Sequence, residues 1–143
     1  LVYIASTSLF RIYPRALELE KRRKRTDASD LSSEDLDLAG RIKRLLQVEK
    51  VYQEPGYGRA DLARELGVTE SGLSRIVNLY FDKSVPQILN ACRVEDAKQL
   101  LEQTEAPVGT VADESGFNSL ATFNRVFKAM EGVSPNEFRA KRR

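Results

Sequence analysis

Residues 60–79 read ADLARELGVTESGLSRIVNL, and this stretch decides the fold. Its first half predicts a short helix that meets Gly67, and Thr69 is placed to cap a second helix. The small side chain of Ala63 lets two helices cross closely, and glycine supplies the positive φ of the turn. Apolar residues fill the predicted seam between the helices: Leu62, Leu66, Val68, Leu73 and Ile76. This pattern is typical of a helix-turn-helix, although any tight helical hairpin satisfies part of it.

A second copy of the pattern follows at an offset of 49 residues. In it Val111, Ala112, Gly116 and Phe117 repeat Leu62, Ala63, Gly67 and Val68. The spacing then lengthens by one, because Phe123 stands seven residues after its glycine and Leu73 six after its own. A longer helix is predicted between the copies from its apolar face, which contains Ile88, Leu89, Cys92, Ala97, Leu100 and Leu101. A duplicated motif is a more specific signal than a single one.

Helical periodicity runs through almost the whole chain, and strand alternation is nowhere sustained, so the predicted fold class is all-α. We expect two helix-turn-helix subdomains joined by a long linker helix, in the manner of a homeodomain-like pair, with an N-terminal helical extension. That extension begins after the capping residues Ser32 and Ser33 and stops near Glu54, since Pro55 and two glycines follow. The predicted parts are a leader at 1–33 and a double helix-turn-helix domain at 34–143. This domain is divided into a first unit at about 34–83, a linker helix at about 85–103 and a second unit at about 106–143.

The composition excludes several classes of protein. Among 143 residues there is no histidine, no tryptophan and one cysteine, Cys92. No disulfide, multi-cysteine zinc site or histidine-based catalytic constellation can be built from such a chain. We therefore expect no enzymatic activity, no metal and no cofactor, and a single unpaired cysteine suits the reducing cytoplasm.

Charge is distributed unevenly along the chain. Residues 1–25 hold seven basic and two acidic side chains, residues 26–54 hold four basic and seven acidic, and the remainder is balanced. The net charge of +2 therefore does not by itself predict a nucleic-acid partner. Any such prediction depends on where individual side chains point.

The N-terminal leader has an apolar part and a basic part. Residues 1–10 are nearly uncharged, and residues 21–25 are all basic. The apolar part is too short to span a bilayer, which takes about 20 residues. Two interpretations stay open: residues 1–17 are the end of a transmembrane helix that holds the domain on the cytoplasmic face of a membrane, or the leader is an amphipathic or disordered segment with solvated charges.

Helical projection separates an inner from an outer face in the second helix of each motif. In the first motif the inner face is Leu73, Ile76, Val77 and Tyr80, and the outer face is Ser71, Ser74, Arg75 and Asn78. In the second the predicted inner stripe is Leu120, Phe123, Phe127 and Met130. Outward positions there are Asn118, Ala121, Arg125 and Lys128, with Thr122 and Asn124 at the margins.

Arg75 and Arg125 occupy equivalent outward positions in the two copies. An arginine there can contact a guanine edge with two hydrogen bonds, whereas Ser, Thr, Asn and Lys suit phosphates or mixed contacts. Each arginine taken alone is equally an ordinary solvated charge, but the matched positions favour groove contact. A linker helix that holds two such helices about 34 Å apart would present them to successive major grooves, about 10 base pairs apart.

These residues resemble the DNA-binding domain of the AraC/XylS family of transcription regulators. The resemblance runs from about Glu34 to Arg142 and is strongest in LARELGVTESGLSRI, CRVEDAKQLL and GFNSLATFNRVFKAMEGVSPNEFR. It implies seven helices, two helix-turn-helix units and transcriptional control through sequence-specific binding of double-stranded promoter DNA, with RNA polymerase as a further partner. The acidic linker at residues 26–33, the helix ending in EKVYQEP and the apolar-then-basic leader also resemble the subgroup in which this domain follows a membrane sensor.

Carried over by position, the resemblance implies specific DNA contacts. The base-contacting set is Ser71, Gly72, Arg75, Leu120, Ala121, Asn124 and Arg125. Thr69, Ser74, Ser119 and Lys128, together with the polar Asn78, Asn118 and Thr122, are predicted to contact phosphates or cap helices.

Three features depart from the family pattern. Asp82 stands where glycine is usual, and an aspartate can imitate it in a left-handed turn at some cost. Leu120 and Ala121 are apolar, so the second unit reads thymine methyl groups or contributes little direct readout. Glu131 replaces a commoner aromatic or neutral residue.

The alternative function is a helical protein-interaction module without DNA binding, which an exposed apolar pair at Leu120 and Ala121 would favour. The operator, the regulated genes, the effector, the oligomeric state and the choice between activation and repression stay open.

Overall fold

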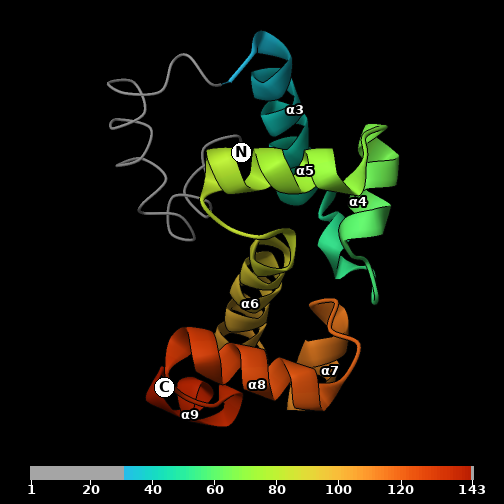
Figure 1. Cartoon of the computed structure of the whole chain (residues 1–143). Coiled ribbons are helices and arrows are strands. Elements are labelled where there is room, and N and C mark those ends of the chain that lie inside the picture. The colour runs from blue at the N-terminus through green and yellow to red at the C-terminus, as the bar shows by residue number, and fades with distance from the viewer. Residues whose placement is uncertain (1–30, 143) are drawn as a thin grey trace. The chain divides into compact units, whose positions relative to one another are not determined.

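The computed structural model describes residues 31–142, which contain seven α-helices and no strand. The predicted all-α class is confirmed. The helices are α3 (Ser33–Arg44), α4 (Arg59–Leu66), α5 (Glu70–Ile76), α6 (Val85–Gln103), α7 (Val108–Glu114), α8 (Leu120–Glu131) and α9 (Pro135–Lys141) (Figure 1). Three short helical turns accompany them: η1 (Leu45–Glu49), η2 (Val51–Gln53) and η3 (Val77–Phe81).

Over residues 31–142 no helix is long and apolar enough to cross a membrane. The hypothesis of a transmembrane remnant at residues 1–17 lies outside this range.

The chain divides into two compact units. The described part of the first unit comprises residues 31–50 and Arg59–Gln87, and that of the second comprises Val51–Gly58 and residues 88–142. The segment Val51–Gly58 thus packs with the second unit although it precedes the first helix-turn-helix in the chain.

The N-terminal helix α3 begins at a capping box. The Ser32 hydroxyl accepts a hydrogen bond from the backbone N–H of Asp35 (3.1 Å), and the Asp35 carboxylate accepts one from the N–H of Ser32 (3.1 Å). The predicted end near Glu54 is wrong, because the helix continues through η1 only to Glu49. Lys50 then adopts a left-handed conformation with φ of 50°, which terminates the helix.

In the first unit α4 and α5 form the helix-turn-helix, and α3 contacts both. The buried side chains of this unit are mainly aliphatic: Ala39, Ile42, Leu46, Leu62, Ala63, Leu66, Leu73, Ile76 and Val77, with Phe81 of η3 buried as well. The side chain of Lys43 on α3 donates a hydrogen bond to the Tyr80 hydroxyl (2.7 Å), which ties α3 to η3. Asp82 closes η3 with φ of 56°, as predicted for the residue that replaces glycine.

In the second unit the segment Val51–Gly58 is fastened to α6. The Tyr52 hydroxyl donates to the Asp96 carboxylate (2.9 Å), and the Arg93 guanidinium donates to the carbonyls of Tyr52 (2.9 Å) and Tyr57 (2.7 Å). Burial, and then the neighbouring Asp96, raise the pKa of Tyr52, so this phenol stays protonated. A Cβ atom built on Gly116 would lie 2.1 Å from the Tyr52 carbonyl oxygen, so this approach requires glycine.

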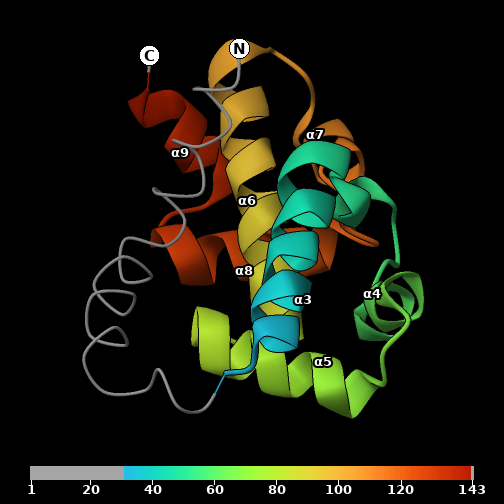
Figure 2. The same ribbon diagram turned by 90° about the horizontal axis from the view of Figure 1, so that it is seen from above.

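The core of the second unit is aromatic. Ring centroids of Phe117 and Phe123 are 5.0 Å apart, those of Phe123 and Phe127 5.5 Å, and those of Phe127 and Phe138 5.5 Å. Val94, Ala97, Leu101, Val111, Ala112 and Val126 complete the cluster. These residues lie where α7, α8 and α9 gather around the C-terminal part of α6 (Figure 2). Cys92 is also buried, as expected for a small core residue.

The predicted inner stripe of α8 is wrong at both of its ends. Leu120 and Met130 are 46% and 48% exposed, whereas Val126 is buried together with Phe123 and Phe127. The apolar cluster includes only the middle turns of α8. Periodicity gives the angular position of a side chain on a helix, but it does not show whether a neighbouring element covers that turn.

Candidate nucleic-acid interface

The two helix-turn-helix units have the same turn geometry. The N–H of Val68 donates to the carbonyl of Ala63 (3.1 Å), and the N–H of Phe117 donates to that of Ala112 (3.0 Å). The intervening glycines, Gly67 and Gly116, have φ of 69° and 93°. Each unit therefore ends its first helix with the same left-handed glycine and the same backbone hydrogen bond.

The extra residue of the second copy is Asn118. Thr69 directly follows Val68, whereas Asn118 separates Phe117 from Ser119. Thr69 and Ser119 both cap the helix that follows them. The Thr69 hydroxyl accepts from the N–H of Gly72 (3.0 Å), and the Ser119 hydroxyl accepts from that of Thr122 (3.1 Å). Counted from the caps the two copies are back in register, and each has an arginine six residues after its cap.

The structure places the predicted site residues of each unit on one helix and its cap. Those of the first unit lie on α5 and η3, and those of the second lie on α8 and the turn before it. Most of them are exposed: Thr69, Ser71, Arg75, Asn78, Asn118, Ser119, Leu120, Ala121, Asn124, Arg125 and Lys128. Gly72, Ser74 and Thr122 are half-buried. Thr69 and Ser119 act as caps, and every DNA contact in this set stays a prediction.

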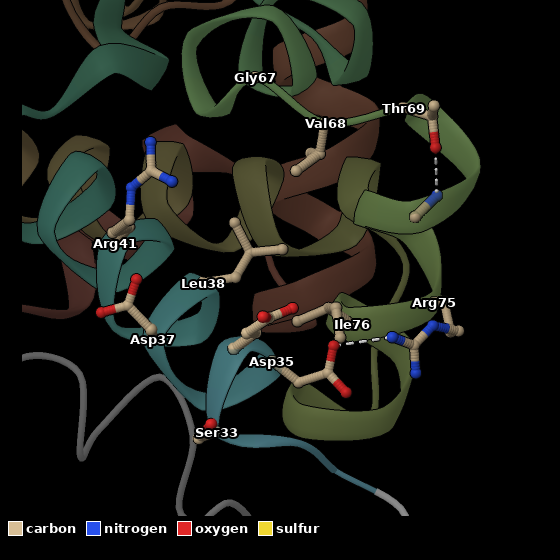
Figure 3. A pocket seen from close by; sticks show the side chains of 12 residues that line it. Ser33, Asp35, Asp37, Leu38, Arg41, Gly67, Val68, Thr69, Arg75 and Ile76 are labelled. Atoms are coloured by element: carbon tan, nitrogen blue, oxygen red, sulfur yellow. Dashed lines mark hydrogen bonds and ion pairs between the residues drawn. The ribbon is translucent and has the colours of Figure 1, made fainter.

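Arg75 is paired with an acid on α3. Its Nη2 atom donates to Oδ1 of Asp35 at 2.7 Å (Figure 3). The arginine side chain is nevertheless 53% exposed, whereas that of Asp35 is only 15% exposed. The guanidinium therefore lies at the surface with one of its donors engaged by a shielded carboxylate.

The Asp35 carboxylate has two fixed partners. Oδ2 accepts from the N–H of Ser32 in the capping box, while Oδ1 accepts from Arg75. The hydrogen bond from the Ser32 backbone, opposed by partial burial and assisted by Arg75, holds the pKa of Asp35 below its ordinary value. From the sequence alone Asp35 has only the favourable position of an acidic residue in the first turn of a helix. Its contact with a residue 40 positions away has no local signal.

A groove runs between the start of α3 and the turn of the first unit (Figure 3). From α3 it is lined by the acidic side chains Glu34, Asp35 and Asp37, and by Arg41; Gly67, Thr69, Gly72 and Arg75 line it from the helix-turn-helix. The Asp37 side chain makes no hydrogen bond or ion pair with any other residue in 31–142, and Figure 3 shows it pointing away from Arg75. The outward arginine of the first unit thus lies beside an acidic surface.

Arg125 has different surroundings. It lies exposed on α8, and within residues 31–142 no acidic side chain pairs with it or with the exposed Lys128. The two outward arginines therefore occupy equivalent backbone positions and have different electrostatic environments.

Among residues 31–142 no group of three or more His, Cys, Asp or Glu side chains is arranged to hold a metal ion.

Comparison with known proteins gives consistent matches. Residues 62–141 match the family model described as a helix-turn-helix domain. The arabinose operon regulatory protein of Salmonella typhimurium is 37% identical over 81 residues, which are 57% of this chain and 29% of that protein. The chain thus spans less than a third of the length of this curated relative.

Solved structures agree with the fold. The C-terminal domain of AraT, a response regulator from Geobacillus stearothermophilus, aligns with a TM-score of 0.66 and 29% identity, covering 80% of this chain and 89% of that one. The DNA-binding domain of AdpA, a global transcriptional factor solved in complex with a target DNA, aligns with a TM-score of 0.65 and 26% identity, covering 73% and 90%.

Proposed function

The chain belongs to the AraC/XylS family of helix-turn-helix transcription regulators, and we propose that it is the part of such a regulator that reads promoter DNA. In this proposal α5 and α8 each enter a major groove of one duplex, in successive turns, so that a single chain recognises two short blocks of sequence. The AdpA domain, which was solved with its target DNA, supports the assignment of this fold to duplex recognition.

The observation that carries the proposal is the matched pair of outward arginines. Arg75 and Arg125 both stand six residues after a helix cap, on the second helix of an identical turn, and both are exposed. Arginine at such a position can donate two hydrogen bonds to the N7 and O6 acceptors of guanine. The shared register favours a common role for the two arginines over two unrelated solvated charges.

The other predicted residues complete the two contact sets. Ser71 and Gly72 adjoin Arg75 on the first helix, and Leu120, Ala121 and Asn124 adjoin Arg125 on the second. The 46% exposed side chain of Leu120 suits contact with a thymine methyl group. Ser74, Asn78, Asn118, Thr122 and Lys128 are assigned to phosphates, with the capping residues Thr69 and Ser119 beside them.

The charge balance limits non-specific affinity. Residues 55–143 hold equal numbers of acidic and basic side chains, so few counterions would be released on binding. Affinity then depends mainly on base contacts and DNA shape.

For the full-length protein the proposal includes RNA polymerase as a second partner, a place in the cytoplasm, and membrane attachment through a longer N-terminus. No enzymatic step belongs to it.

A second candidate function is a helical protein-interaction module. The exposed Leu120 beside Ala121 favours it, because a small apolar patch on an outward face is typical of protein contacts. This alternative uses the same faces of α5 and α8 but predicts no preference for any duplex sequence.

Selection from a pool of random DNA duplexes separates the two functions. The chain of residues 1–143 is incubated with the pool at near-physiological salt, and bound duplexes are sequenced over several rounds. We expect enrichment of two short blocks about one helical turn, or 10 base pairs, apart. A folded chain, helical by circular dichroism, that enriches no sequence would contradict the proposal and favour the interaction module.

A further inference from the structure

The ion pair between α3 and α5 has a consequence for the recognition of DNA sequence. We infer that Asp35 is a specificity-determining positioning residue, whose carboxylate fixes the Arg75 guanidinium so that the first unit reads a base edge and not a phosphate. The inference rests on the proposed function, since it concerns how Arg75 contacts DNA. It also adds α3, outside the helix-turn-helix, to the residues that set specificity.

Asp35 is a rigid support. Its carboxylate uses Oδ2 to accept from the backbone of Ser32 and Oδ1 to accept from Arg75. The capping box holds it at the first turn of α3, and α3 packs against both α4 and α5. Because the carboxylate cannot move far from this place, the long arginine side chain is the partner that becomes ordered.

Arg75 keeps enough donors to read a base. A guanidinium carries five N–H donors in a planar fork, and Asp35 engages Nη2. The side chain is 53% exposed, so the remaining donors are open to a ligand. A bidentate contact with guanine needs two of them in one plane. Restricting the fork before DNA arrives reduces the rotamer freedom lost on binding and favours the one geometry that fits a base.

The acid also weakens the competing contact. An arginine paired with a carboxylate has little net charge. Of the other charged side chains that line the groove, Glu34 and Asp37 are acidic and Arg41 is basic, which leaves one net negative charge. Phosphates near this groove are therefore repelled, which disfavours misplaced complexes held by charge alone. Arg125 has no acidic partner among residues 31–142, so its unit should discriminate less sharply between sequences.

The test compares two variants that remove one negative charge each from α3. Asp35→Asn removes the partner of Arg75, and Asp37→Asn is the matched control, since Asp37 lines the same groove without contacting Arg75. Binding of the full 143-residue chain is measured by fluorescence anisotropy on two duplexes. One carries the site selected by the wild-type chain, and the other carries that site with the block read by the first unit scrambled.

We expect Asp35→Asn to reduce the ratio of the affinity for the selected duplex to that for the scrambled duplex by roughly tenfold. A loss of this size corresponds to a large share of the discrimination that one bidentate base contact provides. Affinity for the scrambled duplex should stay the same or rise, because a repulsive charge is lost. Asp37→Asn should change both affinities by the same factor. In an Arg75→Ala background, Asp35→Asn should leave the ratio unchanged, because the group that it positions is gone.

Three results would overturn the inference. An unchanged ratio in Asp35→Asn means that the acid only caps α3. Tighter binding to the selected site with the ratio preserved means that Asp35 inhibits binding. If Asp35→Asn fails to fold, Asp35→Glu replaces it, because this variant keeps the charge and displaces the carboxylate by one methylene. An undiminished ratio of the two affinities in Asp35→Glu would also overturn the inference. A wild-type chain that selects no site contradicts the proposed function itself, whereas the other results leave that function intact.

Discussion

The first and second helix-turn-helix units build the same turn and surround it differently. Both end a helix with a left-handed glycine, cap the next helix with a hydroxyl and present an arginine six residues later. The buried side chains of the first unit are mainly aliphatic, with Phe81 among them, whereas the second unit packs on a chain of phenylalanines. Arg75 has an acidic partner on α3, whereas Arg125 has none among residues 31–142.

This comparison separates what a turn fixes from what its neighbours add. A turn determines where the arginine backbone lies. An additional helix determines whether the guanidinium is restrained and what net charge the surface carries. Duplicated motifs can therefore acquire different reading properties without a change in the turn itself.

The largest expected difference concerns the two turn glycines. Gly116→Ala should lower the free energy of unfolding by more than about 3 kcal/mol, because its Cβ would meet the Tyr52 carbonyl and its φ is 93°. Gly67→Ala should cost only about 1–2 kcal/mol, since a φ of 69° is unfavourable for alanine but no atom beyond the two chain neighbours lies within 4 Å of the added Cβ. Urea denaturation measures both. Equal losses would show that the approach of Val51–Gly58 to the second turn adds nothing to stability.

The caps should behave alike. Thr69→Ala and Ser119→Ala should each cost about 0.5–2 kcal/mol, because each removes one acceptor from a backbone N–H near the start of a helix. Their hydrogen bonds have nearly equal lengths, 3.0 and 3.1 Å. The matched control is Ser71→Ala, an exposed residue of α5 that does not cap it. A loss confined to one unit would break the equivalence of the turns.

The smallest expected effect is a pH dependence confined to the first unit. The folded pKa of Asp35 is lowered, so its contribution is fully present above its unfolded value near 3.8 and is lost as the pH falls through the folded value. The stability of the wild type and of Asp35→Asn should therefore differ by a constant amount from pH 7 to about 5, and the two should converge below about pH 4. Parallel curves over the whole range would mean that Asp35 gains nothing from Ser32 and Arg75.

The local parts of this fold could be predicted from the sequence. Gly67, Thr69 and their counterparts each act within five residues, so the turns and caps follow from residue type and spacing. The same holds for Asp82, whose left-handed conformation depends on its own side chain. The outward faces also follow, since helical periodicity fixes the direction of Arg75 and Arg125.

The remaining features depend on contacts between distant segments. Tyr52 fits the apolar face of the first helix by spacing, but it lies beyond the left-handed Lys50 and bonds to Asp96 of the second unit. Leu120 and Met130 fit the inner stripe of α8 by angle, but the aromatic cluster does not reach them. The pairing of Asp35 with Arg75 requires the packing of α3 on α5, which no local pattern encodes.

The central claim is that two equivalent arginines read two separate blocks of DNA, and the sequence profiles of Arg75→Ala and Arg125→Ala test it most directly. Each variant is taken through the same selection from random duplexes, with Arg44→Ala, an exposed arginine on α3, as the control. We predict that each of the two variants loses preference in one block only, a different block for each, at a cost of about 1–3 kcal/mol, while Arg44→Ala keeps both. Profiles that retain both blocks in both variants would contradict the assignment of these arginines to the bases.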